Sequence, residues 1–282
     1  GMESRISKAY RGEPRDSIDT VFIGNSDIYR AISPVDLFHQ TGITSAIAGR
    51  PNKQLSEVPG DIRDILRYQN PKTIVLETDC MFSGTNPGFK KGISPLEAEA
   101  AKVDVAGHAP SKATNAPQQN IFAKCKALLQ EGDSAFLAAL NYKFPLVKYH
   151  DNWKHLKLTT FLQPRRKYHF SNKGMAYANT VKAYPFGNEY MQLSGGKHAM
   201  LSEEKLDQFQ KIYDLCDRNG IRLVLLTVPS ANTWNKGKSD TVKQLAKKYD
   251  LTYYDYNRQL PADFNWVTDS KDGGNHLNYA GA

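Results

Sequence analysis

The sequence predicts a three-layer α/β/α fold built around a central parallel sheet. Short apolar runs rich in β-branched residues alternate with segments whose apolar residues recur every three or four positions. Strands that alternate with helices favour a parallel sheet covered by helices on both faces. Residues 84–198 interrupt the alternation, and we expect an inserted cap there that is partly irregular and partly helical.

The first half of the alternation precedes residue 84. Buried strands are predicted at residues 18–24, 43–48 and 73–77, and helices at residues 27–41 and 55–66. Pro34 interrupts the first helix, because proline lacks the N–H that a helix interior uses. We expect residues 1–18 to form a lead-in segment and residues 19–282 to form a single domain.

The alternation resumes after residue 198. We expect a helix over residues 201–216 that ends at Asn219-Gly220, a strand at 221–228, a helix at 239–249 and a strand at 251–256. Within the insertion, residues 84–118 read as irregular, and residues 121–129 and 135–149 read as helices.

Composition narrows the function classes. The 282 residues carry 37 Lys+Arg against 29 Asp+Glu, a formal charge of +8 that suits a polyanionic partner of some kind. No apolar run reaches the length of about 18 residues that a membrane-spanning helix needs. The three cysteines, Cys80, Cys125 and Cys216, are widely spaced and predict neither a disulfide framework nor a zinc site. No metal or nucleotide cofactor is indicated.

Polar residues follow the predicted strands, where ligands of a parallel sheet bind. Ser26 follows the first strand, Gly49 the second and Asp79 the third, and residues 269–278 follow the last strand. A serine on such a turn can act as a nucleophile when a histidine oriented by a carboxylate accepts its proton. His276, with Asp272 four residues earlier, meets that requirement. Each feature alone is more often an ordinary turn or a surface histidine.

Taken together, these residues resemble the SGNH (GDSL-type) hydrolase superfamily. Residues 19–34 resemble its first block, Gly49 falls where the second-block glycine lies, and residues 272–281 resemble the final block. The resemblance implies an SGNH, flavodoxin-like α/β/α fold. It also implies a catalytic triad of Ser26, Asp272 and His276, with the N–H groups of Ser26 and Gly49 as the oxyanion hole.

A narrower resemblance extends over residues 8–19, 144–156 and 223–234. These stretches are similar to membrane-anchored, extracytoplasmic proteins of Gram-positive bacteria related to the D-alanyl transfer protein of teichoic-acid modification and to polysaccharide O-acetylation proteins. It implies a surface polysaccharide or acyl donor as substrate and a membrane-bound acyltransferase as partner. Gly1 precedes Met2 and the chain stops within a helix-like segment. We therefore expect a native chain that is longer at both ends, and the resemblance implies that its N-terminal part holds a membrane anchor.

Two departures from the family pattern leave alternatives open. Asp79 stands where the third block presents an asparagine, and an ionised carboxylate cannot donate to an oxyanion. The usual Asp-x-x-His spacing is stretched to Asp272-Gly-Gly-Asn-His276, so Asp269 is the second choice for the triad acid.

We expect a serine esterase or O-acyltransferase acting on an acylated cell-envelope glycan or teichoic-acid-like polymer. The alternative is a catalytically degenerate glycan-binding or assembly component; no motif supports nucleic-acid binding.

Overall fold

Five parallel strands form the centre of the fold, and the computed structural model describes residues 6–83 and 172–282. The strands lie in the order β2-β1-β3-β4-β5, with every neighbouring pair parallel. Their bounds are Thr20–Gly24 (β1), Ser45–Gly49 (β2), Thr73–Glu77 (β3), Arg222–Thr227 (β4) and Thr252–Asp255 (β5). All described residues belong to one of the two compact units of the chain, residues 1–105 with 167–282; the other unit, 106–166, lies outside them.

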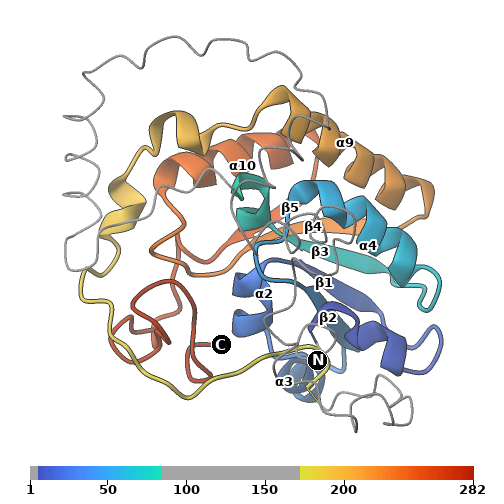
Figure 1. Cartoon of the computed structure of the whole chain (residues 1–282), viewed down its shortest axis with the longest axis horizontal. Helices are drawn as coiled ribbons and strands as arrows, with labels where there is room; N and C mark the ends of the chain where they lie inside the picture. Colours follow the sequence, from blue (N-terminus) through green and yellow to red (C-terminus); the bar gives the residue numbers. More distant parts are fainter. Residues whose placement is uncertain (1–5, 84–171) are drawn as a thin grey trace, which may run out of the picture. The chain divides into compact units, whose positions relative to one another are not determined.

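Helices cover both faces of this sheet, as the alternation predicts (Figure 1). Between β1 and β2 the chain forms α2 (Ser26–Ala31) and α3 (Pro34–Thr41), which pack on β2. The other helices are α4 (Val58–Ile65), α9 (Glu203–Arg218) and α10 (Lys236–Lys248). They connect strands in the opposite direction across the sheet, so right-handed crossovers put them on the opposite face. The three-layer α/β/α prediction is confirmed.

The predicted elements before residue 84 lie close to the observed ones. The break expected at Pro34 is present, because α2 ends at Ala31 and α3 starts at Pro34, with the Ser33 side chain capping its N-terminus. The helix predicted over residues 55–66 begins as a 3₁₀ turn, η2 (Leu55–Glu57), and continues as α4. The predicted helices at 121–129 and 135–149 and the irregular stretch 84–118 lie outside the described residues.

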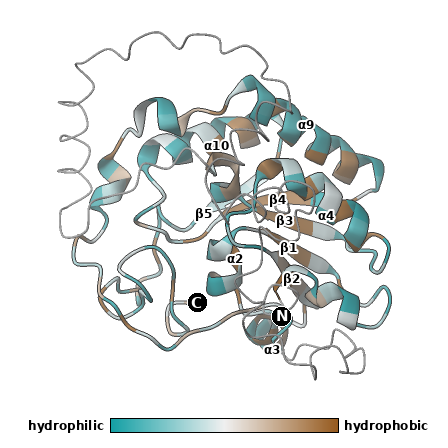
Figure 2. Cartoon of the chain, viewed as in Figure 1, coloured by the Kyte–Doolittle hydropathy of each residue, from teal (hydrophilic) through white to brown (hydrophobic). Residues whose placement is uncertain are grey.

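The core lies between the sheet and its helices. Figure 2 shows hydrophobic residues gathered on the strands, with hydrophilic residues on the helix surfaces that face away. Central strands covered on both faces are largely apolar, since neither face meets water. Fully buried strand residues are Val21, Ile23, Ala46, Ile47, Ile74, Leu76 and Leu225.

The segment before β1 packs on the same unit. The 3₁₀ turn η1 (Ala9–Gly12) buries Ala9 and Tyr10. The Tyr10 hydroxyl donates to Asp64 Oδ2 at 2.5 Å, and Gln69 donates to the Tyr10 carbonyl at 2.9 Å. Residues 6–18 are thereby held against the end of α4. Within residues 6–83 and 172–282, no helix has both the length and the apolar character needed to cross a bilayer.

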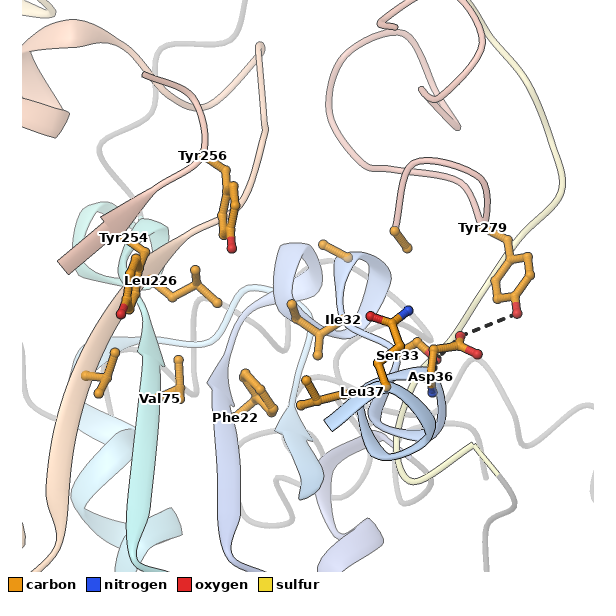
Figure 3. A pocket seen from close by; sticks show the side chains of 14 residues that line it. Phe22, Ile32, Ser33, Asp36, Leu37, Val75, Leu226, Tyr254, Tyr256 and Tyr279 are labelled. Atoms are coloured by element: carbon orange, nitrogen blue, oxygen red, sulfur yellow. Dashed lines mark hydrogen bonds between the residues drawn. The ribbon is translucent and has the colours of Figure 1, made fainter. Parts of the chain in front are cut away.

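An open groove of about 650 Å³ crosses the sheet face that carries α2 and α3 (Figure 3). Apolar side chains of β1, β3 and β4 form its floor, and Tyr254 and Tyr256 stand on the far side from α3. At the near side the Tyr279 hydroxyl donates to Asp36 Oδ2 at 3.4 Å. Neither Ser26 nor His276 lines this groove, so it is separate from the residues that carry the predicted chemistry.

Candidate active site

Ser26 lies on the turn between β1 and α2, as its first helical residue, and is half-buried. The turn is tight because β1 ends in a glycine: a Cβ on Gly24 would lie 2.5 Å from Glu77 Cβ on the neighbouring strand. Asn25 caps the helix by accepting the Asp27 N–H at 2.9 Å. Gly24, which leaves room for the tight turn, and Asn25, which caps α2, together place Ser26 at the carboxyl edge of the sheet.

Asp272 and His276 form a close pair in the loop that follows β5. His276 Nδ1 lies 2.6 Å from Asp272 Oδ2, and the His276 backbone N–H donates to Asp272 Oδ1 at 2.8 Å. Burial alone would raise the pKa of Asp272. The hydrogen bonds from His276 and the positive charges of His276 and Lys271 outweigh burial and lower it to about 2. Asp272 is thus an ionised acceptor that fixes the imidazole.

Two glycines let the loop bring this pair together. Gly273 and Gly274 have φ of +82° and +95°, a backbone region that residues with a Cβ rarely adopt. The Ser270 hydroxyl accepts both of their N–H groups, at 3.0 and 2.7 Å. The extra residue in the Asp272–His276 spacing is therefore accommodated by local backbone geometry, and the carboxylate still reaches the ring.

The turn after β4 holds the histidine loop in place. Asn232 donates its backbone N–H to the Gly274 carbonyl at 3.0 Å and its side-chain amide to the Gly273 carbonyl at 2.9 Å. The Ser230 hydroxyl donates to the Asn275 carbonyl at 2.9 Å. These bonds tie the loop to the carboxyl end of β4, on the same edge of the sheet as Ser26.

Asp27 connects the histidine loop to the serine turn. Its buried carboxyl group interacts electrostatically with His276. The residue next to Ser26 is therefore coupled electrostatically to the histidine. Within the described chain, the His276 side chain bonds to Asp272 and Asn275, and no hydrogen bond joins it to Ser26.

Three acidic side chains are buried behind this edge, namely Asp27, Glu77 and Asp79. Burial raises the pKa of Asp27 to about 7, with a further increase from the Asp79 charge and a decrease from His276. Burial, together with Asp27 and Asp79, holds the pKa of Glu77 well above its usual range. Asp27 Oδ1 and Glu77 Oε2 have no hydrogen-bond partner. Both observations favour a protonated, neutral Glu77 at neutral pH and an Asp27 carboxyl group that is about half protonated there.

Asp79 has charged and polar partners of its own. Lys238 Nζ lies 3.4 Å from its Oδ1, and Asn25 Nδ2 donates to its Oδ2 at 3.0 Å. The side chain thus accepts hydrogen bonds, as the sequence argument anticipates for a carboxylate at this position. Asp269 bonds instead within its own turn, to Asn265 N at 2.8 Å and Thr268 Oγ1 at 2.8 Å. The carboxylate in contact with His276 is therefore Asp272.

Gly49 ends β2 and packs against Tyr29 of α2. A Cβ on Gly49 would lie 2.7 Å from Tyr29 Cδ1, so a side chain has no room there. The Arg50 N–H donates to the Gly24 carbonyl, and alternation along a strand turns the Gly49 N–H to the other side of β2. The hydrogen bonds do not place this N–H beside Ser26, and its oxyanion role stays a prediction.

Sequence reasoning missed three residues of this edge, Asp27, Ser230 and Lys238. Asp27 and Ser230 follow predicted strands, and that position could have identified them. Lys238 carries no such signal, because a lysine in the first turn of a polar helix reads as solvated, whereas here it is fully buried. Among residues 6–83 and 172–282, no group of three or more His, Cys, Asp or Glu could hold a metal ion.

Comparison with known proteins gives weak likenesses to solved structures, two of which are described below. No protein family profile and no curated protein matches the chain. Among solved structures, a candidate acylhydrolase of Bacteroides fragilis NCTC 9343 is 12% identical with a TM-score of 0.40, over 98% of this chain and 87% of that one. A GDSL-like lipase of Bacteroides thetaiotaomicron VPI-5482 is 11% identical with a TM-score of 0.36, over 93% of this chain and 80% of that one. Likeness at this level carries no argument about activity.

Proposed function

We propose that this chain is a serine-dependent esterase or O-acyltransferase of the SGNH/GDSL type. The observation that carries the proposal is the double contact between Asp272 and His276, held at the sheet edge where Ser26 begins α2. A histidine whose Nδ1 is occupied by a carboxylate has Nε2 available as a general base.

The reaction runs through a covalent acyl-enzyme. Ser26 Oγ attacks the acyl carbonyl carbon while its proton passes to His276 Nε2, and the carbonyl oxygen becomes an oxyanion. The oxyanion collapses, the ester bond breaks, and the leaving alcohol takes the proton back from His276. Water or a sugar hydroxyl then repeats the sequence in reverse, which gives hydrolysis or transfer. We assign the oxyanion to the Ser26 N–H, with Gly49 as the second donor to be tested.

The substrate we propose is an acylated cell-envelope glycan or teichoic-acid-like polymer. The formal charge of +8 supports an anionic polymer, because a basic surface raises the local concentration of polyanions. An extracytoplasmic location, an N-terminal membrane anchor and a membrane-bound acyltransferase partner belong to the same proposal. They rest on the sequence resemblance over residues 8–19, 144–156 and 223–234.

Hydrolysis of p-nitrophenyl acetate tests the chemistry. We expect a measurable wild-type rate that Ser26→Ala and His276→Ala abolish, while Ser56→Ala and His39→Ala, at exposed positions, retain it. Mass spectrometry after treatment with a fluorophosphonate should find the label on Ser26. Equal rates for the wild type and the Ser26 variant, with no label, would reject a serine mechanism.

A second candidate function is a catalytically degenerate glycan-binding or assembly component. The observation that favours it is that His276 bonds to Asp272 and Asn275 and not to Ser26. Calorimetric binding of an O-acetylated glycan that is equal in the wild type and Ser26→Ala, without turnover by either, would support this alternative. Turnover by the wild type alone would exclude it.

A further inference from the structure

Asn25, which directly precedes Ser26, uses both ends of its side-chain amide. Its Oδ1 accepts the Asp27 N–H at 2.9 Å and its Nδ2 donates to Asp79 Oδ2 at 3.0 Å. The residue is buried, at 6% exposure, so water cannot replace either partner. Turning the amide over would set its oxygen against a carboxylate and its NH₂ against an N–H. The two bonds therefore fix a single orientation of Asn25 and, with it, the start of α2.

Asp79 is held just as firmly at the end of β3. Its backbone N–H donates to Glu77 Oε1 at 2.6 Å, and its Oδ1 faces Lys238 Nζ at 3.4 Å. Lys238 is fully buried on α10, where its ammonium also donates to the Thr233 carbonyl at 2.5 Å. Buried charges persist in a fold only when they are paired. Lys238 thus supplies the countercharge for a carboxylate at position 79.

The hydrogen bond between Asn25 and Asp79 can run in one direction only, because the amide can donate whereas the carboxylate can only accept. Asn25 is the donor and Asp79 the acceptor, and the same acceptor binds the Lys238 ammonium. An aspartate at position 25 would face Asp79 with like charge. An asparagine at position 79 would have to turn its NH₂ toward either Asn25 or Lys238, both of which are donors. Exchanging the two residues would restore a donor–acceptor pair at the same net charge.

We propose that Asp79 is a positioning residue that acts through Asn25 to set the turn carrying the Ser26 nucleophile, and this inference rests on the proposed function. Among the described residues, the Asp79 side chain bonds to Asn25 and Lys238, and no hydrogen bond joins it to Ser26 or His276. It holds the capping residue of α2, and the cap fixes where Ser26 leaves the strand. The Asp79 carboxylate therefore helps to position the Ser26 nucleophile by accepting a hydrogen bond from Asn25. This role differs from that of a residue that donates a hydrogen bond to the oxyanion.

An exchange experiment tests the proposal. The variants are Asn25→Asp, Asp79→Asn and the double exchange of both, with Asn52→Asp and Asp207→Asn as controls at exposed positions. The readout is the second-order rate constant for labelling of Ser26 by a fluorophosphonate, below the melting temperature of every variant. Displacing a reacting group by about 1 Å can cost on the order of 10²-fold in rate, so we expect each single variant to fall 10- to 100-fold. The double variant should return to within about threefold of the wild type.

The outcomes separate this inference from the proposed function. A double variant that is labelled as slowly as the slower single variant, or single variants labelled at the wild-type rate, would overturn the positioning role while the serine mechanism stands. A wild type that is not labelled at all would overturn both. Melting temperatures measured on the same samples exclude a purely structural explanation if labelling remains slow where the single variants are fully folded.

Discussion

Asp272 binds His276 twice, once through the imidazole Nδ1 at 2.6 Å and once through the backbone N–H at 2.8 Å. The backbone contact fixes the position of the residue, and the ring contact fixes the orientation of its side chain. A carboxylate that held only the ring would leave the position of the His276 backbone to the other hydrogen bonds of the loop. The double contact therefore presets the base before substrate arrives, which reduces the reorganisation that proton transfer requires.

Replacing Asp272 by Asn should remove most of the esterase rate while the chain still folds. An amide at position 272 favours the wrong histidine tautomer, and a change of this kind costs about 10⁴-fold in a well-studied serine protease triad. We expect kcat to fall by on the order of 10²- to 10⁴-fold. Asp269→Asn is the matched control, because within the described residues the Asp269 side chain bonds only inside its own turn. A larger kcat loss in the Asp269 variant would identify Asp269 as the triad acid.

The protonation of Asp27 should make stability depend on pH. Its pKa is raised from 3.8 to about 7, whereas in the unfolded chain the group ionises near pH 4. The folded state then binds more protons, so the free energy of unfolding falls as pH rises from about 4 to about 7. The contribution becomes constant only about one pH unit above the folded-state pKa of about 7.

Asp27→Asn should therefore lose less stability than the wild type between pH 5 and pH 8, as measured by urea denaturation. The pKa of Glu77 is raised in the same way, so the variant should retain part of the pH dependence of the unfolding free energy. Asp263→Asn, at an exposed position, serves as the control and should follow the wild type. Identical pH dependence in the wild type and the Asp27 variant would contradict the expectation.

Gly49→Ala should destabilise the fold, whereas Gly60→Ala should stabilise it. The new Cβ at position 49 would lie 2.7 Å from Tyr29 Cδ1, and overpacking of this kind costs about 1–3 kcal/mol. Gly60 lies in α4 with no atom near its Cβ position, and alanine is favoured over glycine in a helix by about 1 kcal/mol. Thermal denaturation of both variants checks this expectation. A Gly49→Ala variant as stable as the wild type would contradict it and would show that the Tyr29 ring moves to make room for the new Cβ.

Lys238→Met should leave the buried Asp79 carboxylate without its ammonium partner. Breaking a buried pair from one side costs about 3–5 kcal/mol. Adding Asp79→Asn to that variant removes the stranded charge and should recover part of the loss. Chemical denaturation of the two single variants and the double variant measures the coupling. Strictly additive effects would show that the 3.4 Å contact contributes nothing to stability.

Local sequence patterns are enough to predict the strands and the residues that follow them. The run that becomes β3 is predicted with the bounds that the structure shows, residues 73–77, because its three central residues are apolar, as expected for a strand covered on both faces. The break at Pro34 follows from the chemistry of a single residue. Ser26, Asp272 and His276 each belong to a short block whose turn chemistry can be read without the rest of the chain.

Tertiary structure decided how those blocks meet. Asn25 and Asp79 are 54 residues apart and Lys238 and Asp79 are 159 apart, yet one buried carboxylate joins all three. No local periodicity records such pairs, because the order of strands in the sheet determines which strand ends become neighbours. From the sequence alone, Asp79 is a carboxylate that cannot donate a hydrogen bond at a position where the family has an asparagine donor. In the structure, Asp79 accepts a hydrogen bond from Asn25 and faces the positive charge of Lys238. A buried carboxylate requires such a donor and such a countercharge, and only the assembled fold brings both within reach.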